Sequence, residues 1–575
     1  MLLFVLGVFA YQTWQAASAL FAARGKAVQV ERLIRAGDFD AATRELHRLR
    51  DDTHRAASAT DGLLWDLGRH LPVVGADVGA VQTAASALDT VTRENAPVAL
   101  RLSRAVDEGR LRPRNGRIDL RAVRELTPTV QRAAASIQGQ AARLDALDLD
   151  AVTFPFEQVI RELAGEVGRA EDAATASATA FELLPRMLGA EEPRSYLLLI
   201  QNNAETRSTG GIPGSVAILH AHRGRLRMGF QGSARDISPL DGPVGRMSPS
   251  ALAVYGETML TDARDATFNP DFPEVARVVA AMLEQRRGTR VDGVVSVDPI
   301  ALSFLLGGTG PVELEQSGRP VSLNQGNVVP VLLNLTYQLL PDPASQDDFF
   351  ESAARAIFDT VMAGRGRSAR TITGLATGTA EHRVLLWSRR PDEQRRIAGT
   401  AVSGELPADP EDPHPHVGFY LNDATAGKPE YYLDYQPSVR AVRCRPEGRQ
   451  DLEASIALSS SMPRDVSGLS PFITGTGQFA PKGTIAVNLR IYGPVGGSVT
   501  RLTVDGESIS VTSDRHEDRQ VAAVPLSLRP GERVVVRAQL TTGPGQSAGP
   551  VLSFTPGVQS QPNGVQLGSA CTDAH

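Results

Sequence analysis

The pattern of hydrophobic and polar residues divides this 575-residue chain into four segments. Residues 1–22 are almost entirely apolar, and residues 26–188 place apolar side chains at helical spacing. In residues 189–384, short apolar runs alternate with helical patterns, which predicts an α/β domain. Residues 385–575 are rich in Val, Thr, Ser, Gly and Pro with regularly spaced turns, which predicts a β-sandwich-like domain. We therefore predict a multidomain α+β protein.

The first segment has the length of a membrane-spanning helix. Residues 1–21 contain no charged residue, and about 20 apolar residues suffice to cross a bilayer as a helix. A cleaved signal peptide is the alternative, but the basic start and a clear cleavage motif are missing. We expect an uncleaved, single-pass transmembrane anchor over residues 1–22.

The second segment predicts long helices with one apolar face. Apolar residues recur at spacings of three, four and seven at Leu120, Val123, Leu126, Val130, Ile137, Ala141 and Leu144. Turn-forming residues interrupt the helical pattern at 71–75 and 112–116. A helix of about 30 residues is about 45 Å long, so we expect residues 26–188 to form a helical stalk or bundle.

The third segment opens with an apolar strand that runs into a polar, glycine-rich turn. Residues 196–200 are continuously apolar, as a strand buried on both faces requires. The candidate ligand-binding and catalytic residues follow directly: Asn202, Asn203, Glu205, Arg207, Thr209, Gly210 and Gly211. Ligands commonly bind at the carboxyl ends of strands in open α/β sheets, where glycine allows close backbone approach. A hydrogen-bonded turn without a ligand is the alternative, because Asn and Gly also build turns.

This turn and four later motifs resemble a bacterial envelope family described as domain of unknown function 4012. The later motifs lie at 268–273, 291–299, 309–312 and 422–432, in the order of that family. Together the matches span roughly residues 60–435. We expect the chain to be a member, although the family itself names no reaction.

A second resemblance, over residues 194–365, is to the LytR-CpsA-Psr phosphotransferases of bacterial cell walls. Those enzymes transfer glycopolymers from polyprenyl pyrophosphate to peptidoglycan. The resemblance rests on the apolar strand with Arg207, a strand that ends in Arg235 and Asp236, and an acidic, arginine-containing helix at 347–362. It implies a LytR-CpsA-Psr-like core over residues 189–384 in which Arg207, Arg235 and Asp236 are catalytic.

The central domain also contains three unusually apolar helical segments, at 273–286, 299–306 and 328–340. In the wall phosphotransferases such helices help to enclose the lipid tail. The alternative is that they only pack on a central sheet. The chain departs from that family at Thr209, where the metal-binding pattern Arg-Ser-Asp has its aspartate. A divalent cation such as Mg²⁺ would then need Glu205 or Asp236 as its ligand.

Charge and cysteine content restrict the choice of partners and compartment. The formal net charge of −6 argues against nucleic acid as the main partner. Cys444 and Cys571 are the only cysteines, and an even pair in an exported domain predicts one disulfide. Two unrelated buried thiols are the alternative. The family resemblance and the cysteines together predict that the body lies outside the cytoplasm, at the cell membrane.

Two functional hypotheses follow. In the first, the protein is either a binding protein or a transferase for a polyprenyl-pyrophosphate-linked glycopolymer. The membrane and peptidoglycan are then its partners, and Arg207 and Arg235 hold phosphate oxygens. In the second, it is a non-catalytic envelope scaffold or binding protein with a degenerate phosphotransferase-like pocket. The position of the two arginines distinguishes these hypotheses. The first hypothesis is favoured if both arginines lie within reach of one phosphate at the mouth of an apolar cavity.

Overall fold

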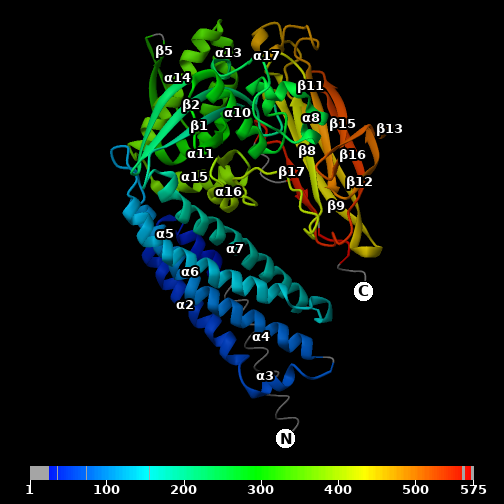
Figure 1. The fold of residues 1–575 in the computed structure, drawn as a ribbon. Coiled ribbons are helices and arrows are strands. Elements are labelled where there is room, and N and C mark those ends of the chain that lie inside the picture. Colours follow the sequence, from blue (N-terminus) through cyan, green and yellow to red (C-terminus); the bar gives the residue numbers. More distant parts are fainter. Residues whose placement is uncertain are drawn as a thin grey trace. The chain divides into compact units, whose positions relative to one another are not determined.

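The computed structural model describes residues 25–34, 36–72, 74–154, 156–316, 318–559, 564–566 and 568–571. The chain forms two compact units (Figure 1). The first is helical and combines the chain up to Arg112 with Ile118–Glu191, and the second contains Pro113–Arg117 and the chain from Glu192 onwards. The predicted anchor at residues 1–22 lies outside the described residues. None of the described helices is both long and apolar enough to cross a membrane.

The helical unit follows the periodicity of its sequence. Residues 25–34 are helical, and the elements that follow are α2 (Phe39–Ala59), α3 (Leu63–Gly68), α4 (Gly75–Thr90), the π-helical η1 (Val91–Asn95), α5 (Ala96–Asp107), α6 (Leu120–Asp145), η2 (Leu149–Ala151) and α7 (Phe156–Met187). The predicted apolar face of α6 is buried at Val123, Val130, Ile137 and Leu144. Asp119 caps α6 by accepting hydrogen bonds from the first backbone amides of the helix.

The second unit begins with a mixed five-stranded sheet in the order β3-β2-β1-β4-β7. Its strands are β1 (Arg194–Asn202), β2 (Ile212–His222), β3 (Arg225–Ser233), β4 (Gly293–Val297) and β7 (Val384–Ser388). Only β1 and β4 are parallel; the other neighbours are antiparallel. The central Leu197 pairs with Ile218 of β2 and Val294 of β4 and is fully buried, as its apolar neighbourhood in the sequence predicts.

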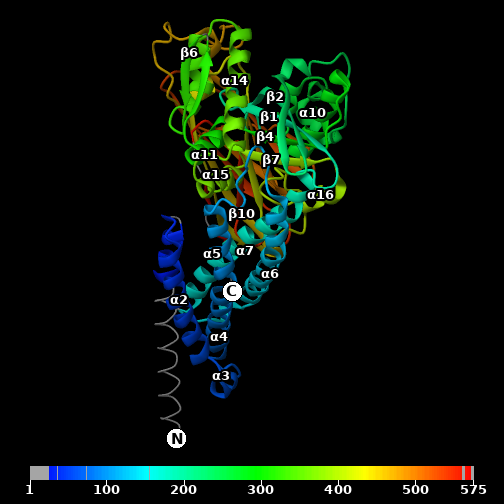
Figure 2. The ribbon, with the colours of Figure 1, turned by 90° about the vertical axis from the view of Figure 1, so that its left-hand side faces the viewer.

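Helices cover both faces of this sheet (Figure 2). Leu197 and Leu199 face α10 (Phe272–Arg287), whose apolar residues lie in the same core cluster. On the other side of the sheet lies a second core. This core is built by α11 (Pro299–Thr309), the hairpin β5 (Val312–Gln316) and β6 (Arg319–Leu323), α12 (Val328–Pro330), the π-helical η5 (Val331–Leu335) and α14 (Pro343–Met362). The short helix α13 (Thr336–Leu339) continues η5, and α15 (Ser368–Ala380) packs against α11.

The C-terminal part of the unit consists of two sheets that enclose one apolar core. One sheet contains β9 (Leu433–Arg445), β10 (Arg449–Ser460), β12 (Ser498–Val504), β13 (Glu507–Ile509), β16 (Arg533–Thr541) and β18 (Val565–Gln566). The other contains β8 (His416–Asp423), β11 (Ile485–Val495), β14 (Ser513–His516), β15 (Arg519–Leu528) and β17 (Val551–Phe554). In β10 every second residue is buried, which is the pattern of a strand with one face on a core.

A disulfide joins Cys444, near the end of β9, to Cys571. The predicted pairing of the two cysteines is therefore confirmed. The bond closes a loop with a sequence separation of 127 residues, which contains most strands of the C-terminal domain.

The α/β domain and the C-terminal β domain pack directly on each other. Val254 and Tyr255 at the end of α8 (Pro249–Tyr255) contact a cluster that contains Tyr492 of β11. The hydroxyl groups of Tyr255 and Tyr492 are 2.8 Å apart, and Tyr492 Oη is 2.8 Å from Nδ1 of His516. The turn after β1 also contacts the β domain, because the backbone amide of Ser208 donates to Oδ1 of Asn422 in β8.

Candidate functional site

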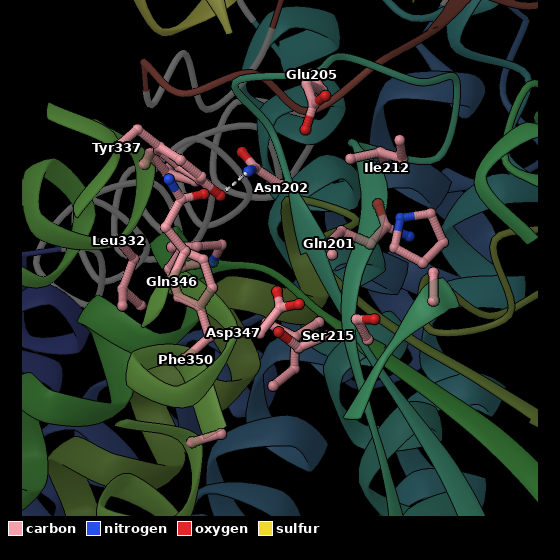
Figure 3. A pocket seen from close by; sticks show the side chains of 18 of the residues that line it. Gln201, Asn202, Glu205, Ile212, Ser215, Leu332, Tyr337, Gln346, Asp347 and Phe350 are labelled. Atoms are coloured by element: carbon pink, nitrogen blue, oxygen red, sulfur yellow. Dashed lines mark hydrogen bonds between the residues drawn. The ribbon is translucent and has the colours of Figure 1, made fainter. Parts of the chain in front are cut away.

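An open cleft of about 200 Å³ lies at the carboxyl end of β1. Its floor is the end of β1 and the start of β2, and its opposite wall is built by η5, α13 and α14 (Figure 3). This is the edge of the sheet at which the sequence predicted a ligand site.

Asn202, the last residue of β1, connects the floor of the cleft to its helical wall. Its side-chain Nδ2 donates to the hydroxyl of Tyr337 on α13 over 2.7 Å, and its Oδ1 accepts from the backbone amide of Ala204 over 3.0 Å (Figure 3). Burial raises the pKa of Tyr337 well above its usual value, so the phenol stays neutral. Asn202 is thus already satisfied by protein groups and positions the wall.

Three cationic side chains from three different elements line the cleft: Arg235, Arg264 and Lys428. Arg235 lies in the short helix η3 (Ala234–Asp236) after β3, and Arg264 lies in α9 (Ala263–Ala266). Lys428 lies in the loop that follows β8. Cations that converge on one cleft from separate elements can neutralise an anionic ligand jointly.

Carboxylates hold two of these cations in place. Nζ of Lys428 is 3.2 Å from Oε2 of Glu205 and 4.3 Å from the centre of the Tyr337 ring. Arg264 pairs with Asp262, whose hydrogen bond raises the pKa of the guanidinium. Both cations are therefore oriented before any ligand arrives, which reduces the entropy lost on binding.

Besides Glu205, the carboxylate of Asp347 on α14 lines the cleft. Burial raises the pKa of Asp347, and the nearby charge of Asp236 raises it further, whereas the positive charge of Arg235 lowers it. Asp347 and Arg235 both line the cleft. Figure 3 shows Asp347 facing Ser215 at the start of β2.

The remaining wall of the cleft is apolar. It is built by Pro299 and Leu302 of α11, Leu332 and Leu333 of η5, Phe350, Ala353, Ala354 and Ile357 of α14, and Phe472 of α17 (Pro471–Thr474). Two of the three predicted apolar helices, at 299–306 and 328–340, therefore contribute to the cleft. The third, predicted at 273–286, is α10, which is packed in the core on the other face of the sheet.

The structure separates Arg207 from Arg235. Arg207 does not line the cleft; its side chain is buried, with Nη1 lying 3.6 Å from Oδ2 of Asp423 at the end of β8. The ring of Phe268 lies 4.5 Å from the guanidinium. Arg207 therefore has an internal carboxylate where the sequence predicted a phosphate, since a buried guanidinium requires a paired anion.

The predicted ligand-binding residues after Asn202 are mostly engaged within the protein. Nδ2 of Asn203 donates to Oδ2 of Asp298 over 3.0 Å and to the backbone oxygen of Pro556 over 3.2 Å. Oγ1 of Thr209 accepts from the side chain of Gln201. These contacts give Asn203 and Thr209 a structural role in the turn, which was the alternative reading of the motif.

The two glycines of the turn are required by close packing of the chain on itself. Gly210 has φ = +129°, a conformation that side chains rarely tolerate. At Gly211, a Cβ atom would lie 2.2 Å from the backbone oxygen of Asn202. Neither glycine lines the cleft, so the close approach that they allow is to the end of β1.

Of the two predicted metal ligands, only Glu205 lines the cleft. Asp236 accepts hydrogen bonds from the backbone and side chain of Ser233, as part of a capping box at η3. Glu205 is paired with Lys428. Within the described part of the chain, no three His, Cys, Asp or Glu side chains lie close enough to hold a metal ion. Glu205 and Asp236 therefore each already have a partner within the protein.

The cleft residues that were not predicted as site residues include the charged or phenolic side chains of Arg264, Lys428, Tyr337 and Asp347. Tyr337 and Asp347 lie in helices that were predicted, but periodicity does not tell which side chains face a cleft. Lys428 carried a usable signal, because it is one of only three lysines in a chain whose other cations are arginines. For Arg264 we find no comparable signal.

The fold and the cleft together define an α+β protein with a site that combines basic groups with an apolar wall. Residues 191–337 match the family described as "Protein of unknown function (DUF4012)". The match covers less than half of the chain, contains β1 and its turn, and supports the predicted resemblance to that family. No curated protein matches the chain.

Among solved structures, the chain is similar to one described as the Lin1025 protein from Listeria innocua. The two sequences are 11% identical, and the match covers 38% of this chain and 81% of that one, with a TM-score of 0.20. A TM-score this low supports neither a shared fold nor a shared function.

Proposed function

We propose that this chain is a cell-envelope protein that binds the phosphate-bearing head group of a polyprenyl-linked glycopolymer in the cleft at the end of β1. The observation that carries the proposal is the placement of Arg235, Arg264 and Lys428 beside an apolar helical wall. A site for a small anion does not need that wall, and a site for a purely apolar ligand does not gather three cations. An amphiphile with an anionic head uses both parts.

The size of the cleft limits which part of the lipid it holds. Pockets that enclose a drug-sized ligand usually measure about 300–1,000 Å³, whereas this cleft measures about 200 Å³. It accommodates a phosphate group and the first part of a prenyl chain. The rest of the lipid would remain in the membrane, which fits an open cleft better than a closed cavity.

Transfer of the glycopolymer is a second candidate function, favoured by the position of Asp347. Burial raises the pKa of this carboxyl group, which makes its carboxylate a better proton acceptor. An acceptor hydroxyl would form a bond to the phosphorus that carries the glycan, and its proton would pass to Asp347. The bond from that phosphorus to the bridging pyrophosphate oxygen would break, and polyprenyl phosphate would leave. Arg235 and its neighbouring cations would stabilise the charge that develops.

The location of the protein is part of the same proposal. The uncharged sequence of residues 1–21 supports a membrane anchor, and the disulfide between Cys444 and Cys571 supports an oxidising compartment. The body would then lie outside the cytoplasm, where peptidoglycan is available as the acceptor. If transfer does not occur, the chain acts as a non-catalytic binding protein or scaffold.

Binding is tested by native mass spectrometry and lipid extraction of the full chain purified from a bacterial host. We expect polyprenyl phosphate or pyrophosphate to co-purify. In a titration with polyprenyl phosphate, Arg235→Ala should weaken binding by about 10- to 100-fold, because a charge-assisted hydrogen bond contributes about 1.5–3 kcal/mol. The matched control is Arg227→Ala, an exposed arginine on β3 that does not line the cleft. A protein that remains empty when offered the lipid would refute the proposal.

Transfer is tested separately with Asp347→Asn. If Asp347 accepts the proton, this variant should bind the lipid but transfer the glycopolymer at least 100-fold more slowly, as expected for loss of a general base, which contributes about 10²–10⁴-fold. Transfer at the wild-type rate would remove Asp347 from the reaction. Binding without transfer in the wild-type protein would leave the scaffold function.

A further inference from the structure

One end of the helical unit exposes an unusual number of apolar side chains. Leu63, Leu67 and Phe154 are exposed by 81%, 68% and 78%, although side chains of these types are usually buried. We call the exposed set the apolar tip, and it consists of Leu63, Leu64, Leu67, Leu71, Val74 and Phe154.

The members of the apolar tip come from two segments that the fold brings together. Leu63, Leu64 and Leu67 belong to α3, and Leu71 and Val74 lie between α3 and α4. Phe154 lies between η2 and α7, and its neighbour Thr153 donates backbone and side-chain hydrogen bonds to Asp77 at the start of α4. Figure 1 shows α3 and the connection between α6 and α7 at the same end of the unit. Trp65, which lies among the tip residues of α3, is buried in the core of the helical unit. The exposed residues of the tip therefore lie on the surface of a packed region.

The first described helix, at residues 25–34, has a defined direction relative to α2. Lys26 pairs with Asp52, and Val30 packs in one cluster with Leu46 and Leu49 of α2. The helix at 25–34 therefore runs antiparallel to α2, and its amino end points towards the end of α2 that precedes α3. From Asp52 to the end of α2 at Ala59 is about 10 Å along the helix axis.

We propose that the apolar tip contacts the surface of a lipid bilayer. The proposal goes beyond ligand binding in the cleft, and it rests on the membrane anchor of the proposed function. The chain enters the described helix from a stretch of 21 uncharged, mostly apolar residues. If that stretch spans a membrane, the helix direction brings the apolar tip to the membrane surface. Exposed leucine and phenylalanine side chains suit the boundary between head groups and acyl chains.

Charges near the tip predict the kind of contact. The charged residues beside the exposed leucines in the sequence are Asp61, Asp66 and Arg69, so the α3 segment has no excess of positive charge that would attract anionic lipids. The contact is therefore hydrophobic, and we expect it to depend little on salt concentration or on the content of anionic lipid.

The experiment places a spin label on the full chain, reconstituted in phosphatidylethanolamine–phosphatidylglycerol vesicles. Leu67→Cys carries the label on the tip, and Asp107→Cys is the matched control. Asp107 is exposed at the end of α5, near the start of α2, where Arg104 pairs with Asp40. The two native cysteines are joined in the disulfide, so each variant offers one reactive thiol. The accessibility of each label to oxygen and to a water-soluble nickel complex is then compared.

The compared quantity is the ratio of accessibility to oxygen over accessibility to the nickel complex. We expect this ratio to be at least threefold higher for the label at 67 than for the label at 107. A label at 67 that is as accessible to nickel as the control would place the tip in water and overturn the proposal. A label shielded from both reagents would show that protein covers the tip, and would also overturn it. Failure of the chain to float with the vesicles would refute the anchor and this contact, but it would leave ligand binding by the cleft untouched.

Leu63→Gln with Leu67→Gln provides a second measurement that does not depend on a label. The replaced side chains are largely exposed, so the fold should persist, as checked by circular dichroism. If the tip enters the bilayer, protection of the α3 segment from limited proteolysis in vesicles should be lost in this variant, at low and high salt alike. Equal protection in the wild type and the variant would contradict the proposal.

Discussion

The guanidinium of Arg207 and the carboxylate of Asp423 form a buried ion pair, with Nη1 lying 3.6 Å from Oδ2. Arg207 belongs to the turn after β1, and Asp423 ends β8, so this pair joins the α/β sheet to the β domain. A second contact crosses the same junction, because Oδ1 of Asn422 accepts from the backbone amide of Ser208. The most distinctive turn of the sequence therefore holds two domains together.

Replacement of Arg207 should mainly lower the stability of the fold, because Arg207 does not line the cleft. Arg207→Ala would leave the buried Asp423 without its cation, and removing one partner of a buried ion pair costs about 3–5 kcal/mol. We expect the second unit of the variant to unfold at a clearly lower urea concentration than that of the wild type, as followed by tryptophan fluorescence. Arg227→Ala, exposed on β3, is the control and should change stability by less than about 0.5 kcal/mol. Unchanged stability of Arg207→Ala would contradict the structural role.

The apolar wall of the cleft predicts how affinity depends on the length of the lipid chain. Affinity for prenyl phosphates should increase over the first isoprene units and then level off, because the cleft is small and each buried methylene contributes about 0.8 kcal/mol. Phe350→Ser should reduce this gain while leaving the affinity for inorganic phosphate unchanged. Isothermal titration with phosphates of increasing chain length measures the effect. A variant that loses affinity equally for all chain lengths would contradict an apolar subsite at Phe350.

His516 predicts an acid-sensitive junction between the two domains. Burial lowers the pKa of His516 to about 4, and its Nδ1 lies 2.8 Å from the hydroxyl of Tyr492. Between pH 6.5 and about 4 the unfolded chain binds a proton that the native state does not, so stability falls as the pH is lowered through this range. The loss attributable to His516 is at most about 3.4 kcal/mol, at about 1.36 kcal/mol for each pH unit.

The measurement is the free energy of unfolding of the wild type and His516→Gln from pH 4 to 7. The variant should lose the contribution of His516, so the difference in stability between the two proteins should change with pH. A constant difference between the wild type and His516→Gln over the whole range would show that burial of His516 does not affect its titration.

The disulfide predicts a large effect of reduction on the C-terminal β domain. The bond between Cys444 and Cys571 spans 127 residues, and a loop of this length is expected to contribute about 4–5 kcal/mol by restricting the unfolded chain. The double variant Cys444→Ser, Cys571→Ser should therefore unfold at lower urea concentration, and reductant should lower the stability of the wild type but not that of the variant. Equal stability of both proteins under oxidising conditions would contradict this account.

Local patterns in the sequence were sufficient for the secondary structure near the site. The strand predicted at 196–200 lies within β1, and the helix predicted at 347–362 is the larger part of α14. The direction of α14 relative to β1 could not be predicted from local patterns. This direction is the reason why Asp347 and Phe350 face the cleft. A helix of one amphipathic pattern can present the same face to many partners, so its position follows from packing.

The sequence by itself determined the types of elements, the order of the domains along the chain and the disulfide, because hydrophobic periodicity and the presence of only two cysteines are local or compositional properties. Only the tertiary structure decided which charged groups meet. Arg207 and Arg235 both appeared suited to phosphate, but Arg207 pairs with Asp423 while Arg235 shares the cleft with Lys428. A buried charge takes the partner that packing brings within a few ångströms, and residues so far apart in the chain reveal that partner only after folding.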